Sequence, residues 1–249
     1  MSRLKSWTLG LGAGLLGAWW AAGRALSPRY PDIALQAGLE LVSFPRRVLA
    51  ISPHPLDLEW FCGGACFLMK RAGGTVTAAV LTRGEAGGNR ANMGQIREKE
   101  QAQSGAILGY ESIAYLGCKD QQLHAADLAP KLEAVWRQIR PDVVLTFDPR
   151  GALPGRLSNP DHAAAGAAVL ELLRSGIGNS TRVYLYGTRS PNVAVDITEV
   201  VQEKEAAVRA HRSQMAGPDA VAKAAVRAYG RLLRGRTPSF YSETFYRLV

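Results

Sequence analysis

Four clusters of polar side chains lie close to the ends of apolar segments that have the composition of buried strands. The first cluster places His54, Asp57 and Glu59 just after the apolar segment 48–51. The clusters span residues 54–59, 82–85, 148–150 and 159–162. Because the carboxyl ends of parallel strands share one edge of a sheet, the four clusters could converge there.

Two of these clusters carry the ligand types of a catalytic zinc site. Such a site usually takes three protein ligands from His, Asp and Glu and leaves a fourth position for water. His54 and Asp57, three residues apart in one turn, and His162 in the fourth cluster supply this set. A histidine in a loop is more often an ordinary polar residue, so the spacing alone leaves both interpretations open.

The segments between the clusters alternate in character from residue 48 onward. Short runs rich in Val, Ile and Leu predict strands, and longer charged or alanine-rich stretches predict helices. We predict strands at 48–51, 75–82, 112–116, 142–147, 182–188 and 192–197, and helices at 95–108, 128–139, 161–174 and 198–214. This alternation predicts an α/β fold in which helices cover both faces of a mostly parallel sheet.

The N-terminal segment 7–23 carries no charged residue and has Trp7 at one end and Trp19 and Trp20 at the other. Its length is near the lower limit for a membrane-spanning helix, and tryptophan suits membrane interfaces. We therefore expect a single uncleaved membrane anchor in preference to a cleavable signal peptide, with a slight lean to an extracytoplasmic domain. The expected layout is an anchor or signal at 1–27, a connector at 28–47, a main domain at 48–215 and a basic helical extension of it at 216–249.

Charge and cysteine content exclude several classes of protein. The net charge is +9, but no basic run is interleaved with aromatic residues, so we expect no nucleic-acid partner. The three cysteines form no disulfide framework, and Cys62 and Cys66 lie in an apolar glycine-rich segment typical of a core. No GxGxxG motif follows the segment 48–51, which argues against a nucleotide-binding protein.

Five motifs occur in an order that is more specific than any one of them. They are HPLDLEWFCGG at 54–64, LTRGEAG at 81–87, YLGCKDQQL at 115–123, SNPDH at 158–162 and DITEVVQEKEAAVRAHRSQ at 196–214. In this order they resemble the LmbE/PIG-L-like zinc N-deacetylases, and the likeness runs from about residue 48 to residue 214. The resemblance implies a Rossmann-like three-layer fold with one zinc ion (Zn²⁺), and removal of acetyl from an N-acetylglucosamine unit, often on a glycoconjugate.

The resemblance also implies roles for individual residues. The family patterns are His-Pro-Asp-Asp-x-Glu and His-Pro-Asp-His, so His54, Asp57 and His162 match the three metal ligands. Asp161 matches the aspartate beside the last ligand, where it would orient or charge the site. In the TRGE loop Arg83 and Glu85 match residues that shape the substrate side, and we also expect Asp148 on that side.

Two positions depart from the family patterns. Leu56 replaces the aspartate that usually takes a proton from water, and Asn159 replaces a histidine, so it can donate a hydrogen bond to the oxyanion but cannot transfer a proton. Each loss could cost on the order of 10²–10⁴-fold in rate. Candidates for a relocated base are Glu59, Glu85 and Asp148.

These departures leave two functional hypotheses. We favour a membrane-anchored, zinc-dependent hydrolase that removes an N-acetyl group from an amino sugar or glycoconjugate. The alternative is a pseudoenzyme that keeps its zinc and binds a sugar or glycolipid at the membrane without hydrolysing it.

Overall fold

The computed structural model of the chain describes residues 38–44, 46–151, 159–215, 217–231 and 239–248. Within these residues, seven strands form one sheet in the order β3-β2-β1-β4-β5-β7-β6. Neighbours from β3 to β5 are parallel, whereas β7 is antiparallel to both β5 and β6. The strands are β1 Arg47–Ser52, β2 Thr75–Thr82, β3 Ser112–Cys118, β4 Val143–Phe147, β5 Arg182–Tyr186, β6 Val193–Asp196 and β7 Ser242–Arg247.

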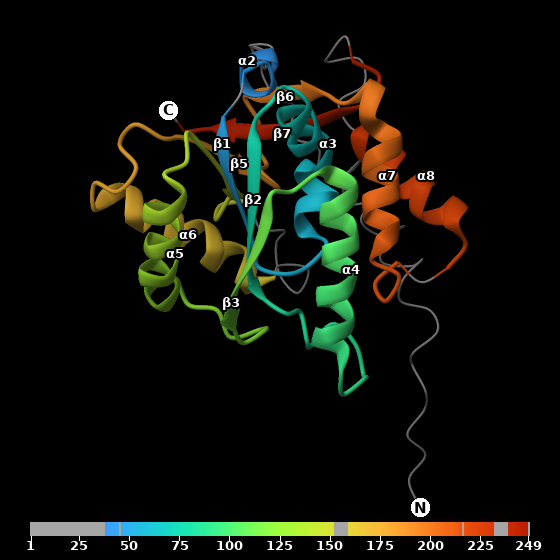
Figure 1. Ribbon diagram of the computed structural model, residues 1–249, viewed down its shortest axis with the longest axis horizontal. Helices are drawn as coiled ribbons and strands as arrows, with labels where there is room; N and C mark the ends of the chain where they lie inside the picture. Colours follow the sequence, from blue (N-terminus) through green and yellow to red (C-terminus); the bar gives the residue numbers. More distant parts are fainter. Residues whose placement is uncertain (1–37, 45, 152–158, 216, 232–238, 249) are drawn as a thin grey trace, which may run out of the picture.

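Helices cover both faces of the sheet (Figure 1). On one side lie α5 (Ala125–Ile139) and α6 (Pro160–Arg174), and on the other α3 (Asp57–Arg71), α4 (Met93–Leu108) and α7 (Val201–Ala210). The remaining helices are α2 Leu39–Val42, the 3-10 turn η2 Thr198–Val200 and α8 Asp219–Gly230. The predicted α/β fold with a mostly parallel sheet is confirmed.

The apolar residues of β1 show why this arrangement forms. Val48 and Ala50 belong to the core cluster beneath α3, whereas Leu49 and Ile51 belong to the cluster beneath α5 and α6. All four side chains are buried, so the strand is apolar on both faces and requires a helix layer on each.

The sheet reverses its strand order between β1 and β4. From β1 the chain proceeds outward to β2 and β3, and from β4 it proceeds outward in the opposite direction to β5. In open α/β sheets such a switch point leaves a crevice beyond the carboxyl ends of the two central strands. The first polar cluster follows β1 and the third follows β4, so both face this crevice edge.

Helix α3 is kinked at Cys62, whose backbone is not helical (φ −142°, ψ 15°). The amides of Gly64 and Ala65, just after the kink, donate to the two carboxylate oxygens of Glu243 at 2.9 and 2.8 Å. Lys204 Nζ lies 2.5 Å from Glu243 and donates to the carbonyl of Trp60 at 2.7 Å. The buried carboxylate therefore caps the second half of α3 while Lys204 compensates its charge.

Two expectations from the sequence concern the ends of the chain. The expected membrane-anchored location is corrected: none of the helices in the described part of the chain is long and apolar enough to cross a membrane. The proposed anchor at 7–23 itself lies outside the described residues. At the other end, the expected helical extension at 216–249 contains α8 but also β7, which lies between β5 and β6 in the sheet.

Candidate metal centre

The turn after β1 brings His54 and Asp57 together. Asp57 is the first residue of α3, and its Oδ2 accepts the backbone N–H of His54 at 3.0 Å. The same oxygen lies 3.2 Å from His54 Nδ1. Leu56, the N-cap residue of α3, has a left-handed backbone with φ 90°, which gives the turn its sharp change of direction.

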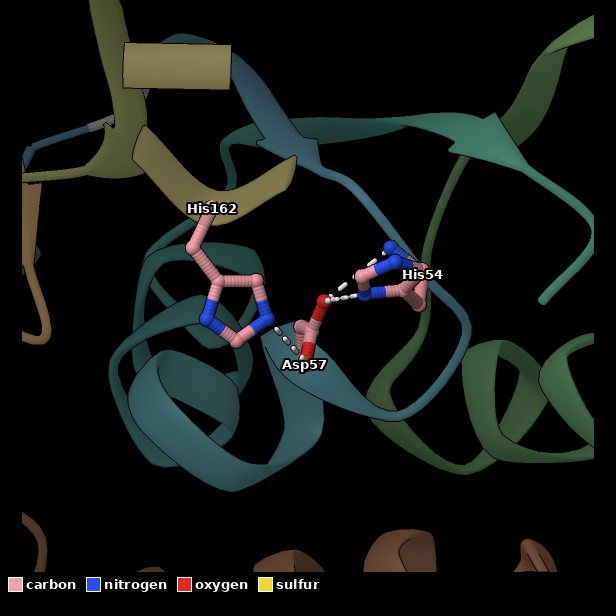
Figure 2. Close-up of side chains that lie close together, drawn as sticks. All are labelled: His54, Asp57 and His162. Atoms are coloured by element: carbon pink, nitrogen blue, oxygen red, sulfur yellow. Dashed lines mark hydrogen bonds and ion pairs between the residues drawn. The ribbon is translucent and has the colours of Figure 1, made fainter. Parts of the chain in front are cut away.

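His162 reaches this turn from the opposite layer of the molecule. It lies in the first turn of α6, where Asn159 is the N-cap and Pro160 the first helical residue. His162 Nε2 lies 3.5 Å from Asp57 Oδ1 (Figure 2). The imidazole stacks on the ring of Phe147, the last residue of β4, with centroids 3.9 Å apart. Packing against the strand end therefore fixes the direction of the ring.

The three side chains form a group that fits a metal ion. One ligand atom from each of His54, Asp57 and His162 lies within 4.8 Å of the other two. Two imidazole nitrogens and one carboxylate oxygen are ligands that zinc commonly takes. His54 is buried, whereas Asp57 and His162 are partly exposed, so the group opens toward solvent on one side. The donor chemistry and the exposure both suit a catalytic metal site.

Two further carboxylates contact the far side of His54. Its Nε2 lies 3.1 Å from Asp120 Oδ1 and 3.1 Å from Asp161 Oδ2. Asp161 also accepts the backbone N–H groups of Gln121 and Leu123, at 2.7 and 3.2 Å, which fixes its carboxylate. A carboxylate on the second nitrogen of a ligating histidine orients the ring and raises its basicity.

Asp120 was not among the residues singled out from the sequence. It lies inside the YLGCKDQQL motif, in the loop that follows β3 at the same sheet edge as the other clusters. The available signal was an aspartate at a strand end, which is the rule that selected the other candidates.

The charges around His54 favour a positive group. Burial acts to lower the pKa of His54, but contacts with Asp120, Asp161 and Asp57 outweigh it and raise that pKa well above its ordinary value. Burial acts to raise the pKa of Asp57, but His162 and His54 outweigh it and hold that pKa far below its ordinary value. Three carboxylates therefore surround one imidazole, an environment that stabilises either a proton or a metal cation.

The residues expected on the substrate side lie on the surrounding loops. Arg83 is exposed, and its Nε lies 2.7 Å from Glu98 on α4. Glu85 is exposed as well, and it accepts the backbone N–H of Asp120 at 2.9 Å. Asn159 uses its side-chain oxygen to accept the N–H of Asp161 at 3.0 Å, which caps α6.

The other two candidate bases have buried carboxylates with partners of their own. Glu59 accepts from Gln101 Nε2 at 2.8 Å, and its second oxygen lies 3.4 Å from His211 Nε2. Asp148 accepts from Thr188 Oγ1 at 2.7 Å and from Arg150 Nε at 3.0 Å. The structure thus places Glu59 between α3, α4 and the end of α7, and Asp148 beside Arg150 at the end of β4.

Comparison with known families matches residues 49–173 to the family described as PIG-L: GlcNAc-PI de-N-acetylase. This region is half of the chain and contains His54, Asp57, Asp120 and His162.

Curated relatives cover a longer part of the chain. A Bacillus cereus protein named "Probable N-acetyl-alpha-D-glucosaminyl L-malate deacetylase 2" is 30% identical over 190 residues, which are 68% of this chain and 84% of the relative. A Thermococcus kodakarensis protein named "Diacetylchitobiose deacetylase" is 31% identical over 190 residues, which are 68% of this chain and 70% of the relative.

Among solved structures, the N,N'-diacetylchitobiose deacetylase of Pyrococcus horikoshii superposes with a TM-score of 0.74. The match covers 100% of this chain and 95% of that one, at 24% sequence identity. At this identity the likeness establishes the fold.

Proposed function

Because the chain belongs to the PIG-L family of de-N-acetylases, we propose that it is a zinc-dependent hydrolase that removes the N-acetyl group from an N-acetylglucosamine-type sugar or glycoconjugate. Its family and its relatives make it an enzyme of the N-deacetylase class. The observation that carries the proposal is the convergence of His54, Asp57 and His162 beyond the carboxyl ends of β1 and β4, where the sheet reverses its strand order.

In this proposal His54, Asp57 and His162 hold the metal. When bound there, zinc supplies a Lewis acid that polarises the amide carbonyl and makes water acidic enough to attack at neutral pH. Asp161 and Asp120 keep the His54 ring in place from its far side. Arg83 and Asp148 line the substrate side.

Asn159 is proposed to stabilise the oxyanion that forms on the amide. Its side-chain oxygen accepts the N–H of Asp161, so the NH₂ group is the donating end of the side chain. A donor fixed in this way needs no reorientation as negative charge develops, which is the basis of oxyanion stabilisation.

The proton acceptor that replaces the missing aspartate is proposed to be Glu85. Of the three candidates it alone is exposed, and it contacts Asp120, which in turn contacts His54. Glu59 is fully buried against Gln101 and His211, and Asp148 is held by Arg150 and Thr188. Of the three, only Glu85 combines solvent access with a hydrogen bond to the backbone of Asp120, a residue whose side chain contacts His54.

One observation favours the alternative of a protein that binds an amino sugar without hydrolysing it. Leu56 lies next to the ligand Asp57, and a leucine cannot accept a proton. A protein that kept its metal ligands and lost this group would still bind zinc and an N-acetylated sugar.

Zinc content and acetate release from the full chain test both functions. We expect one equivalent of zinc and release of acetate from diacetylchitobiose or N-acetylglucosaminyl malate that stops with chelator and returns with zinc. Glu85→Gln keeps the hydrogen-bond acceptor for Asp120 but removes the base, so kcat should fall on the order of 10²-fold. Glu133→Gln, at a partly exposed position on α5 away from the candidate metal centre, serves as the control.

The two functions give different outcomes. Stoichiometric zinc with binding of sugar but no acetate release would favour the binding protein, and absence of bound zinc would contradict both. Retention of full activity in Glu85→Gln would contradict the role of Glu85 alone.

A further inference from the structure

The backbone of Leu56 is held in a conformation that leucine rarely adopts. Its φ of 90° lies in the left-handed region, where the side chains of L-residues crowd the backbone. Such conformations persist only where the surrounding structure determines them. Because Leu56 lies between His54 and Asp57, whatever fixes its backbone also fixes the relative direction of these two side chains.

Helix α4 contacts both ends of the peptide group that precedes Leu56. Arg97 Nη2 donates to the carbonyl of Pro55 at 2.7 Å, and the N–H of Leu56 donates to Gln101 Oε1 at 3.1 Å. The carbonyl of Pro55 and the N–H of Leu56 belong to one planar peptide unit. Arg97 and Gln101 are four residues apart and therefore lie on one face of the helix. Together they fix the orientation of this peptide plane.

Each of the two side chains is itself held from behind. Gln101 Nε2 donates to Glu59 at 2.8 Å, which directs the amide oxygen toward Leu56. Glu59 in turn lies against His211, 3.4 Å away. The buried Glu59 thus orients the amide of Gln101, a role that requires no contact with substrate.

Arg97 also connects the turn that contains His54 and Asp57 with the loop that carries Arg83 and Glu85. Its Nη1 donates to the carbonyl of Gly84 at 2.8 Å. A Cβ atom on Gly84 or Gly87 would lie 2.3 or 2.4 Å from this nitrogen, so the loop packs directly on the guanidinium. One planar group with fixed donors therefore spans two loops of the site, which a lysine ammonium cannot reproduce.

From this geometry we infer that Arg97 and Gln101 are positioning residues of the deacetylase, which clamp the Pro55–Leu56 peptide so that His54 and Asp57 converge on the metal. The inference rests on the proposed function, because convergence matters only if these residues hold a metal. The clamp touches neither substrate nor metal, so it acts through the turn. Residues that support metal ligands typically contribute on the order of 10–100-fold to metal affinity or activity.

The test compares Gln101→Met with Gln103→Met in the full chain. Methionine has a similar length but offers Leu56 no hydrogen bond, and Gln103 is exposed on the same helix, which makes it a matched control. The measurements are hydrogen exchange of the Leu56 amide in zinc-free protein, the zinc dissociation constant by chelator competition, and kcat and KM with diacetylchitobiose. For Gln101→Met we expect exchange at Leu56 at least 10-fold faster, zinc binding on the order of 10–100-fold weaker and a lower kcat at saturating zinc, with KM within about twofold.

A second substitution separates positioning from general destabilisation. Asparagine tolerates the left-handed region better than leucine and cannot act as a base. Leu56→Asn in the Gln101→Met background should therefore recover part of the lost zinc affinity, although it restores no contact with α4. If Gln101→Met does not fold, Arg97→Lys replaces it with the same expected pattern.

The outcomes are distinguishable from one another. Unchanged exchange at Leu56, or faster exchange with unchanged zinc affinity and kcat, would overturn the inference. Weaker zinc binding in Gln101→Met with no recovery by Leu56→Asn would point to loss of stability and would also overturn it. A wild-type chain that binds zinc without releasing acetate contradicts the proposed hydrolysis, and the exchange and zinc measurements then still test the clamp. A wild-type chain that binds no zinc contradicts both the proposed hydrolysis and the clamp.

Discussion

Leu56 combines an unusual backbone with an unusual side chain for its place in the site. Its residue type removes the expected proton acceptor, and its φ of 90° is one that aspartate or asparagine adopts more readily than leucine. The backbone of the turn therefore has a conformation that suits an aspartate. This means that the missing carboxylate can be supplied without rebuilding the turn.

We predict that Leu56→Asp raises kcat for acetate release on the order of 10²-fold, because a general base next to the metal ligands adds to whatever acceptor the chain now uses. The measurement is steady-state kinetics at saturating zinc with the full chain. Leu56→Asn is the control, since it has the same backbone preference without the carboxylate. An equal gain in both variants would mean that relief of the turn, and not a base, limits the rate.

At the level of single residues, the sequence named the three candidate metal ligands, although their spacing alone did not show that they lie together. His54, Asp57 and His162 were named from residue type and position, and they lie together. Asp120 was missed although it follows a predicted strand, because an aspartate in a loop is common and its contact with His54 is seen only in the folded chain. Glu59 was considered as a base, yet its burial beside Gln101 and His211 depends on packing among three helices, which local sequence does not reveal.

At the level of elements, a buried ion pair from two distant segments lies at the kink in α3. Lys204 on α7 and Glu243 on β7 are both fully buried, and they meet at the kink. A buried charge without its partner is strongly destabilising, whereas removal of both charges is often tolerated. The pair therefore ties three elements together at the helix that begins with Asp57.

We predict that Lys204→Met lowers the free energy of unfolding by about 3–5 kcal/mol, because Glu243 is then left buried without a compensating cation. The double variant Lys204→Met/Glu243→Gln should recover part of this loss, since no net charge stays buried. Urea unfolding of the zinc-free chain measures both. Arg137→Met, which breaks an exposed pair with Glu133, should change stability by about 1 kcal/mol or less. A double variant less stable than Lys204→Met would contradict the charge explanation.

Strand β7, which carries Glu243 of this pair, was harder to predict from the sequence than the central strands. The strands β1, β2 and β4 are apolar runs, so composition alone identified them. The segment 242–247 contains Ser, Glu, Thr and Arg, and its glutamate is buried only because Lys204 and two amides of α3 meet it. Thr244, Phe245 and Tyr246 favour a strand, but nothing local shows that this segment lies inside the sheet, and the C-terminal part was expected to be helical.

At the scale of the whole molecule, the candidate metal centre joins the two helix layers. Helices α3, which begins with Asp57, and α6, which carries His162, lie on opposite faces of the sheet (Figure 1), and His54 follows the end of β1. The ligands also come from both sides of the switch in strand order. A metal bound by all three would therefore strengthen the link between the two layers that the contacts of Asp57 with His162 and of His54 with Asp161 already make.

This arrangement predicts that zinc stabilises the whole chain and that a chelator reverses the effect. A ligand that binds only the folded state adds about 2.7 kcal/mol at a concentration 100 times its dissociation constant. Urea unfolding with zinc and with chelator measures the difference. In His162→Ala the difference should shrink, because the metal loses one ligand and its link to the helix layer that contains α6. In His124→Ala, at an exposed position, the difference should persist. Equal zinc stabilisation in wild type and His162→Ala would show that the metal binds elsewhere, and the cross-link between the two layers would then have to be abandoned.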